Sequence, residues 1–338
     1  MRNVGPTAPP GATARGKLLL FGEHSVVHGH RAIGISLPLE LTVRLRANAN
    51  GGHLLTPGLT AQERALIDRA LWRARTLTGL QLTEHTELTI TSTVPEGRGL
   101  GSSGALCGAL SRALFAAAAP AEYNDNSRRI WEVAHEMEHA FHGTPSGIDT
   151  GLALHNGLFA FTPVSGALPD MRSLVGNPLH LLATVVPRSG TTGALVADIG
   201  RRMSEGDAGT RGAIAELGAV AEEAELMLGS PHTRPGEREW IGGLASLVTR
   251  AHELLRSLGL SSLIVETILS QANQFGALGG KLSGAGGGGA LYLLYRNRTE
   301  LCLGAPLLRS ALSSIADLGE CPVYPLEWSG TAIQLIDA

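Results

Sequence analysis

The chain has 338 residues, of which 43% are hydrophobic and 17% charged, and its formal net charge at pH 7 is −3. This composition provides enough apolar side chains for a packed core and excludes an intrinsically disordered protein, and the length allows one large domain or two ordinary ones. No basic stripe indicates a nucleic-acid partner, and no apolar run approaches the ~20 residues of a membrane-spanning helix, so neither nucleic acid nor membrane is expected.

The numbers and positions of the cysteines and lysines indicate a cellular location and two candidate functional residues. Three widely spaced cysteines, Cys107, Cys302 and Cys321, do not suggest a disulfide framework and predict a reducing, cytoplasmic location. Among 27 lysines and arginines, only Lys17 and Lys281 are lysines. A codon bias toward arginine explains the imbalance, but not why both lysines stand inside glycine-bounded segments. Because a compact ammonium and a planar guanidinium are not interchangeable, both lysines are candidates for specific roles.

The first half of the chain is predicted to mix strands and helices. Residues 1–16, rich in Pro, Ala and Gly, are expected to form a flexible arm. In chain order, the patterns then predict a buried strand at 17–21, a half-buried strand at 33–47, a helix at 60–78, a strand at 87–94, a glycine loop at 97–104, an Ala-rich helix to about 119, a helix at 127–142 and a loop at 143–147.

The second half of the chain has the same mixed character. The patterns predict strands at 151–161 and 179–186, two helices within 191–229, helices at 237–258 and 262–276, a strand at 290–295, a helix near 304–318 and a terminal strand. No internal repeat is evident. This mixture predicts two α/β or α+β layers with a boundary near residue 180, hence an N-terminal domain over 17–180 and a C-terminal domain over 181–338.

Two glycine-rich loops suggest ligand binding. Residues 95–104 join a predicted strand to a predicted helix, so inward-turned N–H groups and the helix start form an anion cradle, while the serines suit phosphate or Mg²⁺. The G-x-G-x-x-G within this loop is a weak dinucleotide signal, since no acidic residue ends a second strand about 20 residues on. A plain helix-capping turn is the structural alternative. Residues 284–289 contain five glycines in six positions, which favours close approach to a ligand or to another backbone.

A polar helix and the loop after it carry the acid and imidazole groups. His135 and His139 match the H-E-x-x-H zinc pattern, although a solvated histidine pair explains them as well. Glu138 and Asp149 are predicted to lie near the same loop. One such carboxylate near a phosphate cradle can hold Mg²⁺ and the other can act on a substrate hydroxyl, whereas Asp149 could also simply cap a turn.

Three segments in order, residues 16–29, 95–104 and 281–289, resemble the three motifs of the GHMP kinases, which phosphorylate small molecules without a Walker A loop. Among these kinases the mevalonate kinases are the most similar. The G-E-H-S-V-V-H-G of the first segment and the H-G-T-P-S-G-I-D of residues 142–149 resemble their signatures, and residues 187–192 resemble a substrate-side segment. The chain departs from the family pattern at Arg15, Gly104 and Ala290.

The resemblance implies a fold and an activity. The fold is the two-domain GHMP kinase fold, with an N-terminal S5-domain-2-like α/β domain, a C-terminal ferredoxin-like α+β domain and the active site between them. The activity is ATP- and Mg²⁺-dependent phosphorylation of the 5-hydroxyl of mevalonate, in the mevalonate route to isoprenoids. Many relatives are homodimers, so the resemblance also implies a homodimer. Another small alcohol, such as phosphomevalonate or a sugar, is the alternative acceptor. A binding protein of this fold that has lost catalysis is the alternative class.

The resemblance also implies roles for single residues. Asp149 is the base that accepts the hydroxyl proton, and Lys17 lies beside it. Ser103 and Glu138 hold Mg²⁺. The ATP cradle comprises Pro95, Gly97, Gly99, Leu100, Gly101, Ser102, Ser103 and Gly104. The mevalonate site comprises Lys17, Glu23, His24, Asp149, Thr192, Gly284, Ala285 and Gly286. For Lys281 two roles stay open: a specific role at the third motif, or that of a cation at the C-terminal end of the 262–276 helix, which the helix dipole favours.

Overall fold

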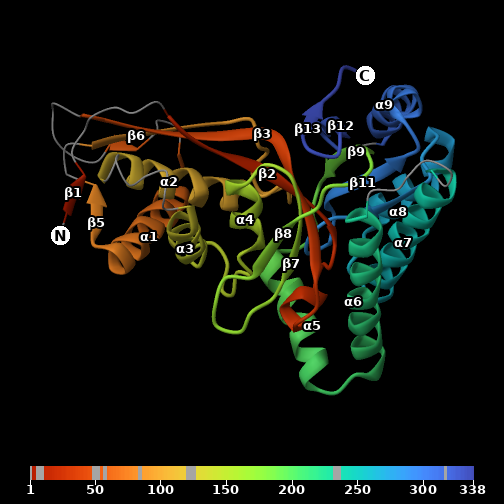
Figure 1. The fold of residues 1–338 in the computed structure, drawn as a ribbon, viewed down its shortest axis with the longest axis horizontal. Helices are drawn as coiled ribbons and strands as arrows, with labels where there is room; N and C mark the ends of the chain where they lie inside the picture. The colour runs from red at the N-terminus through yellow and green to blue at the C-terminus, as the bar shows by residue number, and fades with distance from the viewer. Residues whose placement is uncertain are drawn as a thin grey trace. The chain divides into compact units, whose positions relative to one another are not determined.

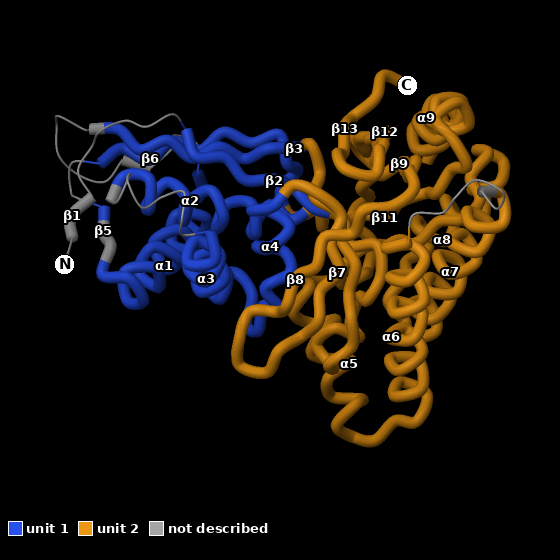
Figure 2. Tube along the Cα trace, in the orientation of Figure 1, with its two compact units in different colours: residues 1–17, 39–96, 101–155 blue, residues 18–38, 97–100, 156–338 orange. Residues whose placement is uncertain are grey.

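A computed structural model describes residues 2–4, 11–47, 54–55, 59–82, 86–118, 127–230, 237–315 and 318–338 (Figure 1). Its residues fall into two compact units, which Figure 2 colours separately. Unit 1 comprises residues 1–17, 39–96 and 101–155, and unit 2 comprises residues 18–38, 97–100 and 156–338. The chain therefore enters each unit more than once. The predicted domain boundary near residue 180 stays a prediction.

Unit 1 combines helices and strands. The helices are α1 (Ala61–Thr78), α2 (Ser102–Ala118), α3 (Ser127–Glu138) and α4 (Ile148–Leu154), and α2 packs against both α3 and α4. The second half of β3 (Ala32–Ala47) pairs antiparallel with β6 (Thr86–Ser92), which pairs in parallel with β4 (Leu54–Leu55). β1 (Arg2–Val4) and β5 (Leu80–Leu82) form a separate parallel pair.

Local signals account for the bounds of α1. Thr60 and Glu63 form a reciprocal capping box at its start, and Gly79 ends it in the left-handed conformation with φ 72°. The predicted 60–78 helix is confirmed. α3 buries Ile130, Val133 and Met137, as its apolar spacing predicts, but it ends at Glu138 and not at 142, because the chain turns there and Phe141 N and His142 N donate to the Glu138 carbonyl.

Two further sequence expectations in this region were wrong. Strand β2 (Ala12–Phe21) begins at Ala12, so residues 12–16 belong to a strand and not to the predicted arm. Residues 151–154, predicted as strand, lie in α4, and strand β7 (Leu158–Thr162) starts later. A short apolar run does not distinguish a buried helix from a buried strand. Gly147, with φ 79°, turns the chain into the helix.

Unit 2 is built on a five-stranded antiparallel sheet in the order β10-β11-β9-β12-β13. Its strands are β9 (Leu179–Val186), β10 (Gly279–Leu282), β11 (Gly289–Tyr295), β12 (Val323–Trp328) and β13 (Ile333–Leu335). The start of β3 pairs with β7, and β7 pairs with β8 (Asp170–Ser173). The predicted strands 179–186 and 290–295 are confirmed.

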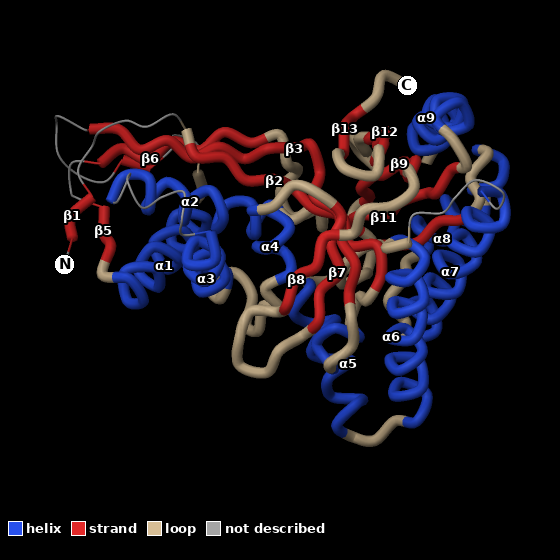
Figure 3. The backbone as a smooth tube through the Cα atoms, in the orientation of Figure 1, coloured by secondary structure: helices blue, strands red, loops and turns tan. Residues whose placement is uncertain are grey.

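The helices described in unit 2 are α5 (Thr192–Ser204), α6 (Ala208–Leu228), α7 (Glu237–Ser257), α8 (Leu263–Ser270) and α9 (Arg298–Ser314), with short 3-10 turns η1 (Ser25–His28) and η3 (Ala272–Phe275). α7 and α8 lie against β10, α6 lies against α7, and α9 lies against β9 and β12 (Figure 3). Among the described residues no helix is long and apolar enough to cross a membrane.

The structure corrects three predictions in unit 2. The 262–276 helix is divided into α8 and η3, which ends at Gly276 with φ 78°. Lys281 lies within strand β10, so it is not a cation at a helix end. The helix predicted near 304–318 begins at Arg298 instead, because the Asn297 side chain accepts a hydrogen bond from Glu300 N and caps it.

Candidate active site

Lys17 and Asp149 form an ion pair inside unit 1. Lys17 lies on β2 and Asp149 in the first turn of α4, with Nζ and Oδ1 3.1 Å apart. The lysine side chain is 7% exposed and the carboxylate 30%, so the ammonium is held in place while the carboxylate remains accessible. The structure thus brings together the two residues that the resemblance implied to be catalytic.

The glycine loop packs directly against this pair. Gly101 has φ 82°, and a Cβ built on it would lie 2.6 Å from Lys17 Cγ. A Cβ on Gly104 would lie 2.9 Å from the backbone carbon of Asp149. Neither distance is compatible with an ordinary side chain, so these glycines allow the start of α2 to touch both members of the ion pair.

The start of α2 has the features of an anion site. Gly97, Gly99 and Gly101 all adopt positive φ, at 67°, 89° and 82°. The helix begins at Ser102, which makes Ser102, Ser103 and Gly104 its first three residues, and its first turn contains no acidic side chain. N–H groups in this turn lack intrahelical acceptors and suit a phosphate. Pro95 is half-buried, whereas Leu100 as a whole residue is 0% exposed, so Leu100 supports the loop from inside and is not accessible to a ligand in this structure.

Glu138 of α3 carries a buried carboxyl group. It is 2% exposed, and its Oε2 has no hydrogen-bond partner among the residues that the structure describes. Burial raises the pKa of Glu138 well above its ordinary value, and the charge of Asp149 adds to the increase, while Lys17 and a hydrogen bond with Thr150 oppose it. An unpartnered oxygen on a buried carboxyl group fits a cation ligand, since oxygen donors are those that Mg²⁺ prefers.

His142 links the two predicted metal ligands. Its Nε2 lies 3.1 Å from Ser103 Oγ, and its backbone N–H donates to the Glu138 carbonyl at 3.0 Å. The histidines of the H-E-x-x-H pattern behave differently. The rings of His135 and His139 lie 5.3 Å apart, and His139 Nδ1 faces the Gly143 carbonyl. Within the residues that the structure describes, no three acidic, histidine or cysteine side chains cluster as metal ligands.

In unit 2, the residues predicted to bind the acceptor adopt unusual conformations. Glu23 is fully buried and forms an ion pair with Lys281. His24 has φ 59°, and its Nε2 lies 3.0 Å from the Ala285 carbonyl oxygen. Gly284 and Gly286 also have positive φ, at 85° and 92°. A Cβ on Gly286 would lie 2.3 Å from the Leu260 carbonyl oxygen, so close approach of the protein's own backbone already requires this glycine.

Comparison with known proteins identifies the family. Residues 65–157 match the GHMP kinases N terminal domain, and residues 237–301 match the GHMP kinases C terminal domain. The mevalonate kinase of Pyrococcus horikoshii is 30% identical over 315 residues, which cover 85% of this chain and 89% of the relative. The chain belongs to the GHMP kinases. The mevalonate kinase of Bos taurus is 26% identical over 347 residues, covering 85% of this chain and 86% of that protein.

Solved structures confirm the two-domain GHMP kinase fold. The L. major mevalonate kinase in complex with R-mevalonate has a TM-score of 0.79 at 22% identity, covering 98% of this chain and all of that one. A Streptococcus pneumoniae phosphomevalonate kinase, over 93% of this chain and 100% of that one, has a TM-score of 0.71 at 15% identity. A Lactococcus lactis galactokinase, over 98% and 95%, has a TM-score of 0.70 at 14% identity. The fold is therefore common to GHMP kinases that have different acceptors.

The candidate list for this GHMP kinase lacked Arg188. Its guanidinium donates to Thr192 Oγ1 at 2.8 Å, while its buried Nε has no partner in the described part of the chain. Burial lowers the pKa of Arg188 below its ordinary value. A Cβ on Gly99 or Gly289 would lie 2.9 Å or 2.7 Å from Nη2, so both glycine-rich segments make room for this cation. Arg188 stands in the segment 187–192 that resembles a substrate-side segment, but only Thr192 of that segment was named as a site residue; the contacts with Gly99 and Gly289 now single out Arg188.

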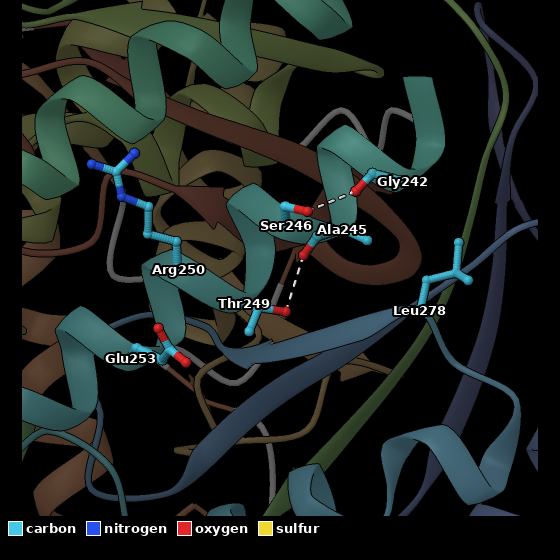
Figure 4. A pocket seen from close by; sticks show the side chains of 7 residues that line it. All are labelled: Gly242, Ala245, Ser246, Thr249, Arg250, Glu253 and Leu278. Atoms are coloured by element: carbon cyan, nitrogen blue, oxygen red, sulfur yellow. Dashed lines mark hydrogen bonds between the residues drawn. The ribbon is translucent and has the colours of Figure 1, made fainter. Parts of the chain in front are cut away.

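A pocket of about 500 Å³ elsewhere in unit 2 is lined by residues other than the predicted site residues (Figure 4). It runs along α7, and its hydroxyl groups are satisfied by their own helix: Ser246 donates to the Gly242 carbonyl and Thr249 to the Ala245 carbonyl, each at 3.0 Å. It contains none of the residues discussed above. The predicted site residues therefore do not line this pocket.

Proposed function

We propose that the chain transfers the γ-phosphoryl group of ATP to the 5-hydroxyl of mevalonate, giving 5-phosphomevalonate in the route to isoprenoids. The Lys17–Asp149 ion pair, 3.1 Å between Nζ and Oδ1 and in contact with the glycine loop, is the observation that carries the kinase chemistry. The choice of mevalonate is supported by the sequence relatives, since the fold alone accommodates several acceptors.

Phosphoryl transfer requires positioning, charge neutralisation and a proton acceptor. Asp149 is the proton acceptor, because its carboxylate is accessible and it lies at the start of a helix, where it is rigidly held. Lys17 neutralises negative charge that develops on the attacking oxygen. The Lys17 side chain is 7% exposed and its ammonium group is compact. It can therefore lie between the hydroxyl and Asp149, where the larger, forked guanidinium of an arginine would not fit.

The start of α2 and the glycines before it would bind the phosphates of ATP through backbone N–H groups. Ser103 and Glu138 would hold Mg²⁺, which neutralises negative charge on the phosphates when bound. The partnerless Oε2 of the buried Glu138 supports this assignment. Arg188, which donates to Thr192 Oγ1, would bind the carboxylate of the acceptor, because mevalonate is an acid and a desolvated guanidinium favours an anionic partner.

A panel of acceptors tests the proposal. ADP release would be measured in a coupled assay with mevalonate, phosphomevalonate, galactose and homoserine at equal concentrations. We expect mevalonate to give the highest kcat/KM and excess EDTA to abolish the reaction. A higher kcat/KM with phosphomevalonate or galactose would reassign the acceptor, and activity with none of the four would favour a GHMP-fold binding protein.

Two further properties belong to this proposal. The three cysteines are free thiols, which supports a reducing location such as the cytoplasm. A homodimer is proposed on the resemblance to the family. Size-exclusion chromatography with light scattering would measure the assembly directly.

A further inference from the structure

His142 joins the ends of two helices in unit 1. It lies in the turn that follows α3, where its backbone N–H and that of Phe141 donate to the Glu138 carbonyl at 3.0 and 2.9 Å. Its Nε2 lies 3.1 Å from Oγ of Ser103, the second residue of α2. α2 and α3 also pack against each other. His142 is therefore joined through its backbone to Glu138 and through its ring to Ser103, which stands 39 residues earlier in the chain.

His142 is better suited to orient a ligand of Mg²⁺ than to be one. Mg²⁺ prefers oxygen donors, which Ser103 and Glu138 supply, whereas imidazole nitrogens suit transition metals such as zinc. Nε2 lies at hydrogen-bond distance from Ser103 Oγ, so this nitrogen is engaged with the serine. Within the described part of the chain, His142 belongs to no group of three acidic, histidine or cysteine side chains that could hold a metal ion by themselves.

The hydroxyl group of Ser103 needs an acceptor for its proton. A serine hydroxyl has one proton and two lone pairs, and it rotates among staggered positions. An oxygen that binds a cation directs a lone pair at it, so the proton must point to an acceptor elsewhere. Nε2 of His142 is such an acceptor when the ring carries its own proton on Nδ1. Because Ser103 and His142 are both half-buried, water competes less for this hydrogen bond.

We propose that His142 is a positioning residue for Mg²⁺ binding: its Nε2 accepts the hydroxyl proton of Ser103 and thereby directs a lone pair of Oγ at the cation. This inference rests on the proposed function, in which Ser103 and Glu138 hold Mg²⁺. His142 acts through Ser103 and contacts neither the metal nor the reacting atoms. Loss of a hydrogen-bond partner behind a metal ligand typically weakens metal binding about 10–100-fold, which sets the size of the expected effect.

Two amide variants of His142 test the hydrogen bond. The amide of Gln extends about as far from the backbone as Nε2 of His, whereas that of Asn ends near the place of Nδ1. Binding of Mn²⁺ in the presence of ATP would be measured by electron paramagnetic resonance of the free ion. We expect His142→Asn to weaken binding on the order of 10-fold and His142→Gln to retain most of the affinity. His139→Asn is the control, since the His139 ring faces the Gly143 carbonyl, and it should leave the affinity unchanged.

A double-mutant cycle separates positioning from support of the fold. If His142 acts through the Ser103 hydroxyl, His142→Asn should have no further effect on Mn²⁺ affinity in a Ser103→Ala protein. Wild-type affinity in folded His142→Asn, or an equal loss with and without the hydroxyl, would overturn the proposal. If His142→Asn does not fold, His142→Leu is measured in the same cycle with the same expected result.

The cycle measures binding and needs no acceptor substrate, so it is independent of the choice of mevalonate. A wild-type protein that shows the expected cycle but phosphorylates no mevalonate would support the role of His142 and refute only the proposed transfer. A protein that phosphorylates mevalonate without the expected cycle would refute only the role of His142.

Discussion

Lys17 Nζ lies 3.1 Å from Asp149 Oδ1, and the backbone of Gly101 lies so close to the lysine that a single added methyl group would approach its Cγ to 2.6 Å. The ammonium is thus fixed on one side by the carboxylate and on the other by the glycine loop. Because of this geometry, a substitution of Lys17, Asp149 or Gly101 should change the rate of turnover.

Lys17→Arg should lower kcat on the order of 100-fold or more while ATP still binds, because the planar guanidinium cannot take the position of the ammonium, and misplacement by about 1 Å has that effect. Steady-state kinetics with ATP titration would measure it. A near-wild-type kcat in a folded Lys17→Arg protein would remove Lys17 from the catalytic residues.

Lys281→Arg should lower the melting temperature, because the Lys281 side chain is fully enclosed in β10. A cation at a helix end would have tolerated the same substitution.

Gly101→Ala should reduce kcat and the melting temperature together. The positive φ alone costs about 1–2 kcal/mol for a residue with a Cβ, and here the new Cβ also collides with Lys17. Gly79→Ala is a matched control in the same unit, since Gly79 has φ 72° with nothing within 4 Å of its built Cβ. It should lose stability but keep kcat. Equal kcat values in the two variants would contradict the contact between loop and lysine.

Glu138→Gln should weaken binding of Mn²⁺, used as a spectroscopic substitute for Mg²⁺, on the order of 10–100-fold in the presence of ATP. Electron paramagnetic resonance would measure the free ion. Without metal, the variant should melt no lower than the wild type, because burial already disfavours the charged carboxylate. Glu136→Gln is the control, since Glu136 pairs with Arg73. The same Mn²⁺ affinity in both variants would show that Glu138 does not hold the metal.

Stability should fall as the pH decreases through about 6.5. Burial lowers the pKa of His252 below its ordinary value of 6.5, although a hydrogen bond with Glu266 opposes this, and burial lowers the pKa values of His24, His135 and His155 as well. The unfolded chain therefore binds protons that the folded chain excludes, so the stabilisation is complete above 6.5 and is lost below it. Melting temperatures across this range should show less pH dependence in His252→Gln than in the wild type.

The parts of the site that depend on local sequence could be predicted. Glycines with special φ and the helix start at Ser102 have signals within a few residues, and they point to the cradle. The long helix α1 is equally local, since its capping box and its terminal glycine mark both ends. The residues that determine such features lie within a few positions of them in the sequence. The Lys17–Asp149 ion pair joins residues far apart in the sequence, and only the resemblance to the GHMP kinases implied it.

The parts that depend on tertiary contacts could not be predicted. Glu23 and Lys281 are 258 residues apart, and nothing near either residue indicates the other. The helix-end alternative for Lys281 is excluded only by the structure, which places this residue in β10. The segment that contains Arg188 was predicted to lie near the substrate, but its approach to Gly99 and Gly289 is visible only in space. The run at 151–154 is apolar throughout, so its periodicity could not reveal that it is helical.

The central claim is that Asp149 accepts the proton as mevalonate is phosphorylated. Single-turnover transfer of labelled γ-phosphate from ATP to mevalonate, followed for the wild type and for Asp149→Asn, tests it most directly. We predict labelled 5-phosphomevalonate from the wild type, and from the variant a rate lower by about 10²–10⁴-fold with unchanged ATP binding, as expected when a general base is lost. A normal rate in folded Asp149→Asn, or no labelled product from the wild type, would contradict it.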